Sequence, residues 1–262
     1  MALQKAGYSG RILGVSSDDT IRAASERGAI HQRATLEEAA ASADLIYLAQ
    51  PISGILSTLD RLGSLPLRPG SLVTDAGSTK IEIVRKATAA LPGVCFLGGH
   101  PMAGKETRGV EAADADLFRG RAYLLTPRSP ADLESPAART LIGWIRKIGS
   151  TVFMLTPEEH DTTVAYTSHL PQMASTALAS VLAALPDDRL PIAGPGALDM
   201  TRLALSAYDI WKDILDTNGE AIDHALTVYI DKLTEIRHNL QTQRLGDEFE
   251  VAADAAIRLR RQ

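Results

Sequence analysis

Short apolar runs alternate with helical patterns over residues 1–155. The runs are bounded by polar or turn residues, as buried strands are, whereas the segments between them repeat apolar residues at helical spacing. Strands are predicted at 11–15, 44–49, 72–75, 94–97, 122–126 and 151–155. Helices are predicted at 1–6, 18–27, 36–43, 52–62, from 81 onward and at 137–148, with 127–136 as a connector. This alternation is typical of a doubly wound sheet of parallel strands.

The pattern changes at Thr156, where strand signals stop and helical periodicity continues. Pro157 and the acids that follow it mark a helix start, because proline and carboxylates are favoured in a first turn. Pro171 is expected to kink this helix. Further helices are predicted at 198–205, 209–216, 219–240 and 247–260. We therefore expect a Rossmann-like α/β domain over 1–155 and an all-helical domain over 156–262 that forms a homodimer.

The chain begins inside what the pattern predicts to be a helix of the α/β domain. In a dinucleotide-binding unit, a strand and a G-x-G-x-x-G loop stand before that helix. Neither stands before Met1. We therefore expect that Met1 is a misassigned or shortened start, and that the natural protein carries roughly 15 to 20 further residues with the strand and the glycine loop.

Composition narrows the classes of partner. The formal net charge is −5. A nucleic acid or a membrane surface as binding partner would require a basic patch, and the sequence does not indicate one. Cys95 is the single cysteine, which excludes an internal disulfide and favours a reducing, cytoplasmic setting. No apolar stretch is long enough to span a bilayer. We expect a cytoplasmic protein that binds a small molecule, without a metal site.

Ser78 and His100 are the strongest candidates for chemistry. Each follows a predicted strand, and the carboxyl ends of neighbouring parallel strands meet where open α/β sheets bind ligands. Ser78 alone could be a helix N-cap, since serine is favoured there. His100 stands in a loop between Gly99 and Pro101 with no apolar face to pack on. Together they predict a site at this edge of the sheet.

The helical half offers two further candidates. His169 lies beside Pro171, where a kink could aim polar side chains into a cleft; alternatively, His169 is a hydrogen-bonded core residue. Arg202 stands in an otherwise apolar stretch, and its planar guanidinium suits a substrate carboxylate. A structural ion pair of Arg202 with Asp199 or Glu106 is the alternative.

Six segments together resemble one family. They are DAGSTK at 75–80, GGHPMAG at 98–104, GVEAADADLF at 109–118, SHLP at 168–171, LDMTRLA at 198–204, and WKDI at 211–214 followed by Asn218. In order and spacing this set is similar to the prephenate/arogenate dehydrogenases of tyrosine biosynthesis. The resemblance covers nearly the whole chain. It implies a Rossmann-type domain, a helical dimerisation domain, and oxidative decarboxylation of prephenate or arogenate with NAD or NADP.

The resemblance also implies roles for individual residues. His100 is expected to accept the proton of the substrate's ring hydroxyl, with Ser78 orienting that hydroxyl and the imidazole, while Arg202 binds a carboxylate. The residues implied to line or gate the substrate cleft are Ser168, His169, Trp211, Glu106 and Asp199. The residues expected to contact the cofactor are Ser16, Ser17, Ala49, Gln50, Pro51, Asp75 and Gly77.

Three positions depart from the family pattern. Gln172 replaces the second histidine of SHLPH near the substrate's side chain, which leaves prephenate and arogenate both open. Lys105 adds a charge at the cleft mouth, where relatives often carry a small hydroxyl residue. The strand that ends at Val15 is followed by Ser16 and Ser17 rather than by an acid for the ribose, which leaves NADP open although Asp18 could reach it.

Two rival functions stay open beside an active dehydrogenase. One is a non-catalytic remnant that binds a pathway metabolite or a partner subunit. Undetectable nicotinamide binding would favour this alternative. The other is a Rossmann dehydrogenase of a different kind, such as a hydroxyacid or imine reductase, which would not need HPMAG and SHLP together.

Overall fold

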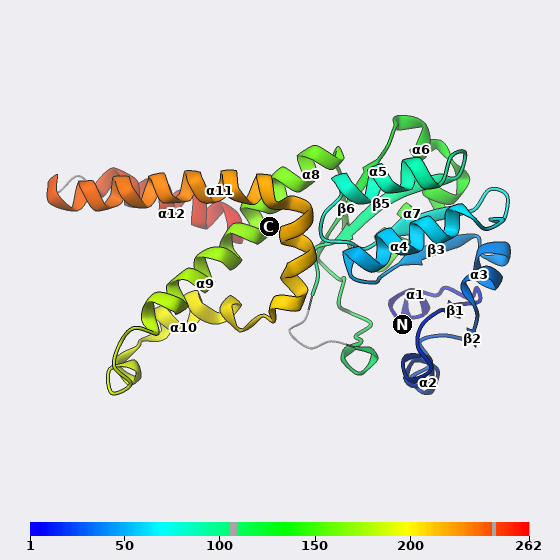
Figure 1. Cartoon of the computed structure of the whole chain (residues 1–262), viewed down its shortest axis with the longest axis horizontal. Coiled ribbons are helices and arrows are strands. Elements are labelled where there is room, and N and C mark those ends of the chain that lie inside the picture. The colour runs from blue at the N-terminus through cyan, green and yellow to red at the C-terminus, as the bar shows by residue number, and fades with distance from the viewer. Residues whose placement is uncertain (105–108, 243–244, 262) are drawn as a thin grey trace.

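The computed structural model describes residues 1–104, 109–242 and 245–261. An α/β part contains every strand of this described chain, and a helical part projects from one side of it (Figure 1). The strands are β1 Leu13–Gly14, β2 Gln32–Arg33, β3 Leu45–Leu48, β4 Leu72–Asp75, β5 Cys95–Pro101, β6 Ala122–Pro127 and β7 Thr151–Met154. The helices of this part are α1 Ala2–Lys5, α2 Asp18–Glu26, α3 Leu36–Ser42, α4 Ile52–Gly63, α5 Ile81–Ala90, α6 Pro130–Glu134 and α7 Pro136–Lys147.

The main sheet has the strand order β3-β4-β5-β6-β7. Strands β3, β4 and β5 are parallel, as predicted, but β6 pairs with β5 in the antiparallel sense. A parallel pair needs a long crossover, usually a helix. In the described part of the β5–β6 connection only the 3-10 turn Val110–Ala112 is regular, so the connection does not provide one. Strand β7 then pairs parallel to β6.

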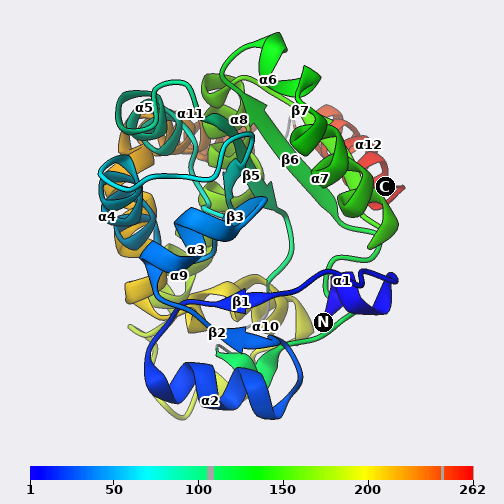
Figure 2. The ribbon, with the colours of Figure 1, turned by 90° about the vertical axis from the view of Figure 1, so that its right-hand side faces the viewer.

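Strands β1 and β2 form a separate two-stranded parallel sheet. Figure 2 shows this pair apart from the main sheet, with α2 beside it. Sequence patterning missed β2, because its two residues, Gln32 and Arg33, are both exposed polar side chains without an apolar face. The connector predicted at 127–136 likewise contains the short helix α6.

The central strands of the main sheet, β4, β5 and β6, are buried on both faces. Helices α4 and α5 cover one face and α7 covers the other (Figure 2). All four residues of β4 are buried, as expected of a central strand that reads as a continuous buried run. This packing fixes the positions of the β4 and β5 carboxyl ends, where the candidate site lies.

The helical part begins with α8, Pro157–Val164, capped by Thr156 and Glu159 in a reciprocal capping box. It continues through the π-helical turn Ala165–His169 into α9, Leu170–Leu182. The irregular turn therefore precedes Pro171. Pro171 stands in the first turn of α9, and Thr167, four residues before it, belongs to the π-helical turn, so the helix is irregular where a proline ring disturbs the preceding turn.

The remaining helices form an arm that extends away from the sheet (Figure 1). They are α10 Pro195–Thr201, α11 Tyr208–Thr242 and α12 Gly246–Arg260, with 3-10 turns at Leu190–Ile192 and Arg202–Leu205. Helix α11 joins the two helices predicted at 209–216 and 219–240, and Asn218 between them has non-helical φ −134° and ψ 23°. Within the described ranges, no helix is long and apolar enough to cross a membrane.

Candidate active site

Asp75 at the end of β4 organises the loop that carries Ser78. One carboxylate oxygen accepts from the Gly99 N–H at 3.1 Å and the other from the Gly77 N–H at 2.8 Å. The second oxygen also forms an ion pair with Lys80, and both side chains are fully buried. The sequence-based prediction that Asp75 contacts a cofactor is therefore corrected, because the protein itself encloses this carboxylate.

His100 lies within β5, next to the loop of Ser78, and is 9% exposed. The prediction that it stands in a loop after the strand is wrong, because β5 continues through Pro101 and His100 pairs with Leu124 of β6. Its Nδ1 is 2.9 Å from Nε2 of His160, and the Nδ1 of His160 is 2.7 Å from Oδ1 of Asp161. His160 and Asp161 belong to α8 and are fully buried. The two imidazoles and the carboxylate therefore form one hydrogen-bonded chain from the sheet into the helical part.

Asp161 also holds the start of α5. Its Oδ1 accepts from the Lys80 N–H at 2.7 Å and its Oδ2 from the Ile81 N–H at 2.9 Å. No side chain at the N-cap position of α5 makes a capping bond, so the cap comes from α8. The alternative interpretation of Ser78 as the N-cap is therefore wrong, and its hydroxyl is not used at that position.

Burial dominates the ionisation of this cluster. Desolvation lowers the pKa of His100 well below its usual value, and the neighbouring His160, Lys80 and His169 lower it further. Desolvation also lowers the pKa of His160, although its hydrogen bond to Asp161 opposes the shift. His100 is consequently neutral at neutral pH and able to accept a proton.

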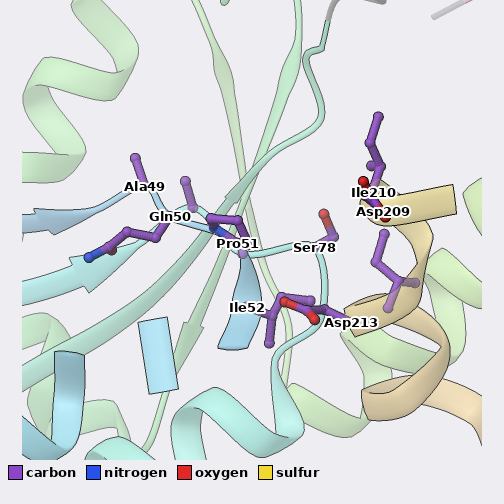
Figure 3. A pocket seen from close by; sticks show the side chains of 11 residues that line it. Ala49, Gln50, Pro51, Ile52, Ser78, Asp209, Ile210 and Asp213 are labelled. Carbon is purple, nitrogen blue, oxygen red and sulfur yellow. The ribbon is translucent and has the colours of Figure 1, made fainter. Parts of the chain in front are cut away.

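A cleft of about 290 Å³ opens at the carboxyl ends of β3 and β4. It is lined by Ala49, Gln50, Pro51, Ile52, Ala76, Gly77, Ser78, Asp209, Ile210, Asp213 and Ile214. Figure 3 shows Ser78 between the Gln50–Pro51 loop and the α11 residues Asp209 and Asp213. Ser78 and the predicted cofactor residues Ala49, Gln50, Pro51 and Gly77 are thus brought together, whereas Ser16 and Ser17 are exposed residues of the β1–α2 connection and do not line the cleft.

Asp213 of α11 closes this cleft against α4. Its Oδ2 accepts from the Ser53 N–H at 2.7 Å, and this bond lowers the pKa of Asp213. Helix α4 has Pro51 at its N-cap position and no side-chain cap of its own. An aspartate of the helical part therefore caps α4, in the same way that Asp161 caps α5.

His169 is buried beside α11. Its Nδ1 lies 3.3 Å from Nδ2 of Asn218, which also donates to the Asp161 carbonyl at 2.9 Å. The ring of Trp211 meets His169 edge-on, with centroids 5.8 Å apart, and burial lowers the pKa of His169 to about 4. These contacts support the alternative interpretation of His169 as a hydrogen-bonded core residue. Ser168, next to it, is half-buried.

Gln172 and Ser175 of α9 hold the 3-10 turn that begins with Arg202. The Gln172 amide donates to the Leu203 carbonyl at 2.9 Å, and the Ser175 hydroxyl accepts from the Ala204 N–H at 3.1 Å. Gln172 is buried, whereas Arg202 is exposed. Lys105 and Glu106, which sequence analysis assigned to the substrate cleft, lie outside the described residues.

Sequence reasoning missed His160 and Asp161 as parts of the site. Both stand one helical turn before the buried apolar residues Val164 and Ala165, and their own polar side chains are fully buried. A buried polar side chain needs a partner, so their place on the same face as Val164 and Ala165 was a usable signal. Their partners on β5 and α5 are 60 and 81 residues away along the chain, and no local pattern points to them.

Comparison with known protein families gives two matches that together span most of the chain. The profile described as "Prephenate dehydrogenase, nucleotide-binding domain" matches residues 1–144. The profile described as "Prephenate dehydrogenase, dimerization domain" matches residues 156–251.

Individual proteins agree with these profiles. The prephenate dehydrogenase of Lactococcus lactis subsp. cremoris is 35% identical over 245 residues, which cover 90% of this chain and 66% of the Lactococcus protein. The chain thus spans slightly less than two thirds of that relative.

Two solved structures superpose on nearly the whole chain. A prephenate dehydrogenase from A. aeolicus, in complex with hydroxyphenyl propionate and NAD+, has a TM-score of 0.86 at 26% identity and covers 99% of this chain and 92% of its own. Synechocystis arogenate dehydrogenase has a TM-score of 0.82 at 28% identity and covers 99% of this chain and 93% of its own.

Proposed function

The chain belongs to the prephenate dehydrogenase family, and from this membership we propose that it oxidatively decarboxylates prephenate to 4-hydroxyphenylpyruvate, with NAD or NADP as hydride acceptor, in tyrosine biosynthesis. The observation that carries the proposal is the buried His100, held neutral on β5 next to the loop of Ser78. A neutral imidazole is the general base that oxidation of a ring hydroxyl requires.

The cleft at the ends of β3 and β4 supports nicotinamide binding. Parallel sheets bind nucleotides at the carboxyl ends of their strands, and the loop Ala49–Pro51 offers backbone groups and the Gln50 amide to such a ligand. A bound nicotinamide supplies the hydride acceptor. Ser16 and Ser17 remain proposed contacts for the adenosine end of the cofactor, and we leave NAD and NADP as alternatives.

In the proposed mechanism, Ser78 binds the ring hydroxyl and directs its proton toward His100. His100 takes this proton while hydride leaves the ring carbon that bears the hydroxyl. Carbon dioxide leaves as the ring becomes aromatic, and the gain of aromaticity drives the reaction forward. Arg202 binds a substrate carboxylate through its planar guanidinium. Further proposed contacts in the substrate cleft are Ser168, Trp211, Lys105 and Glu106.

The domain boundary and the assembly belong to the same proposal. We place the boundary between residues 155 and 156, because β7 ends at Met154 and α8 starts at Pro157. We also propose a homodimer formed by the helical domain. A cytoplasmic location stays a prediction from the single cysteine.

The test is reduction of NAD or NADP by the purified chain with prephenate or arogenate, in all four combinations. We expect turnover in at least one combination, and loss of about 100-fold or more in kcat for His100→Asn, because the base is removed. The exposed His238→Gln is the matched control and is expected to retain activity. A folded protein that is silent in all four combinations would favour a binding protein over an enzyme.

A further inference from the structure

We propose that His160 and Asp161 are positioning residues that hold His100 in one tautomer, with its proton on Nδ1 and its lone pair on Nε2. The inference rests on the proposed function, in which His100 accepts the substrate's proton. It adds to that site two residues of α8 that do not line the cleft.

The order of donors starts at Asp161. Its two oxygens accept backbone N–H groups from Lys80 and Ile81, and an ionised carboxylate has no proton to donate. The Nδ1 of His160, 2.7 Å from Oδ1, must therefore be the donor in that bond. The proton of a neutral His160 is thus on Nδ1, which leaves the lone pair on Nε2.

The second bond then has only one direction. Nε2 of His160 lies 2.9 Å from Nδ1 of His100, and a nitrogen that carries a lone pair can only accept. His100 Nδ1 therefore donates, and Nε2 is left as the basic nitrogen of His100. Had His160 faced a donor in place of Asp161, the same argument would reverse and would protonate His100 on Nε2, the wrong tautomer for a base at that atom.

The surroundings keep His160 neutral. Burial lowers its pKa, and Lys80 acts in the same direction, while Asp161 and the more distant Asp75 act against it. His169 also faces the cluster from the π-helical turn, and its own pKa is lowered to about 4. Since no cation forms on His160 at neutral pH, its Nε2 stays an acceptor.

This arrangement also serves the charged state of the base. When His100 takes the hydroxyl proton, an O–H bond breaks, a bond from Nε2 to hydrogen forms, and the imidazole becomes a cation. The Nδ1–H of that cation points along the chain toward His160 and the Asp161 carboxylate. A hydrogen bond from a charged donor is stronger than one from a neutral donor, so the bond from His100 to His160 strengthens when His100 takes the proton.

The first test reads the tautomers without using activity. Nitrogen-15 NMR of the full chain labelled at its six histidines distinguishes a protonated ring nitrogen from one with a lone pair. His100→Gln and His160→Gln assign the signals by their loss. We expect the proton on Nδ1 in both His100 and His160 near pH 7. A proton on Nε2 of His100 would overturn the proposal.

The second test separates positioning from simple packing. His160→Phe keeps a ring but removes the acceptor, and we expect kcat to fall about 10- to 100-fold with KM changed less than about twofold. His160→Gln returns an acceptor oxygen near the place of Nε2 and is expected to recover part of kcat. His238→Gln controls for loss of an exposed histidine. Unchanged kcat in the Phe variant, or equal losses in Phe and Gln, would reject the role of His160.

The two tests keep this inference apart from the proposed function. If no substrate is turned over but the tautomers are as expected, the proposed reaction is rejected and the hydrogen-bond order from Asp161 to His100 is confirmed. If substrate is turned over and His100 carries its proton on Nε2, the proposed reaction is supported and the proposed hydrogen-bond order is rejected.

Discussion

At the scale of single residues, the site contains a buried ion pair between Lys80 and Asp75. Both side chains are fully buried, and removal from water lowers the pKa of Lys80 while Asp75 opposes this shift. A buried pair is weak evidence for net stabilisation, but breaking one by removing a single partner is costly, because a charge is left without compensation.

We therefore expect Lys80→Met to lower the free energy of unfolding by about 3–5 kcal/mol. Urea denaturation followed by circular dichroism measures it. Lys86→Met is the matched control, since Lys86 pairs with Asp60 at 2.9 Å on the surface, and such pairs contribute about 0–1 kcal/mol. Equal losses in the two variants would contradict a special role for the buried pair.

The residues of the site differ in how far the sequence predicts them. Ser78 and His100 follow short apolar runs in neighbouring segments, so strand order alone brings them to one edge of the sheet. His160 and Asp161 were not predicted as site residues, because their partners are fixed only by the packing of α8 against the sheet. Asp75 looked available for a cofactor, because a sequence does not show that Lys80 and two backbone N–H groups enclose it.

At the scale of elements, helices α4 and α5 of the α/β part have no side-chain cap of their own and are capped by the helical part. Asp213 of α11 caps α4 and Asp161 of α8 caps α5. Each carboxylate also lies at the positive end of a helix dipole. Capping and charge therefore tie the helical part to the sheet at the two helix starts nearest the cleft.

Asp213→Ala is expected to lower the free energy of unfolding by about 0.5–2 kcal/mol, the usual cost of losing a cap. The folded-state pKa of Asp213 is lowered, so its contribution is present above the unfolded pKa and is lost as pH falls through the folded pKa. Denaturation of wild type and variant at pH 7 and near pH 3 tests both statements. The difference is expected to shrink at low pH. Asp216→Ala, an exposed change on the same helix, is expected to have little effect at either pH.

Element boundaries were predictable where local signals were strong. Pro157 with its following acids marked the start of α8, and the predicted ends of α2, α4 and α7 lie within a residue or two of the observed ones. The antiparallel direction of β6 was missed because an apolar run such as 122–126 has no direction. The break between the helices predicted at 209–216 and 219–240 is confirmed, because α11 is kinked at Asn218, whose backbone is non-helical.

At the scale of the whole molecule, the arm carries an unusual amount of apolar surface. Large exposed side chains on it include Ile192, Leu198, Leu205, Phe249 and Val251, each at least 65% exposed. The part of α11 that follows the kink at Asn218, residues 219–242, extends for about 36 Å. Apolar surface of this extent marks an interaction site, which supports the proposed homodimer.

We expect the chain to be a dimer in solution, and Leu198→Asp combined with Phe249→Asp to shift it to the monomer, because two charges would be buried in the interface. Light scattering after size exclusion measures the mass. Glu26→Lys, an exposed change on α2, is expected to leave the dimer intact. A wild-type monomer at micromolar concentration would contradict the proposed assembly.

The caps on α4 and α5 also set an order of events during synthesis. Ser53 leaves the ribosome 160 residues before Asp213, and Lys80 leaves it 81 residues before Asp161. At about 5–20 residues per second, α4 waits roughly ten to thirty seconds for its cap. The last strand, which ends at Met154, therefore leaves the ribosome before Asp161 and Asp213 do, so the helix starts beside the cleft are completed only after all strands of the sheet have been made.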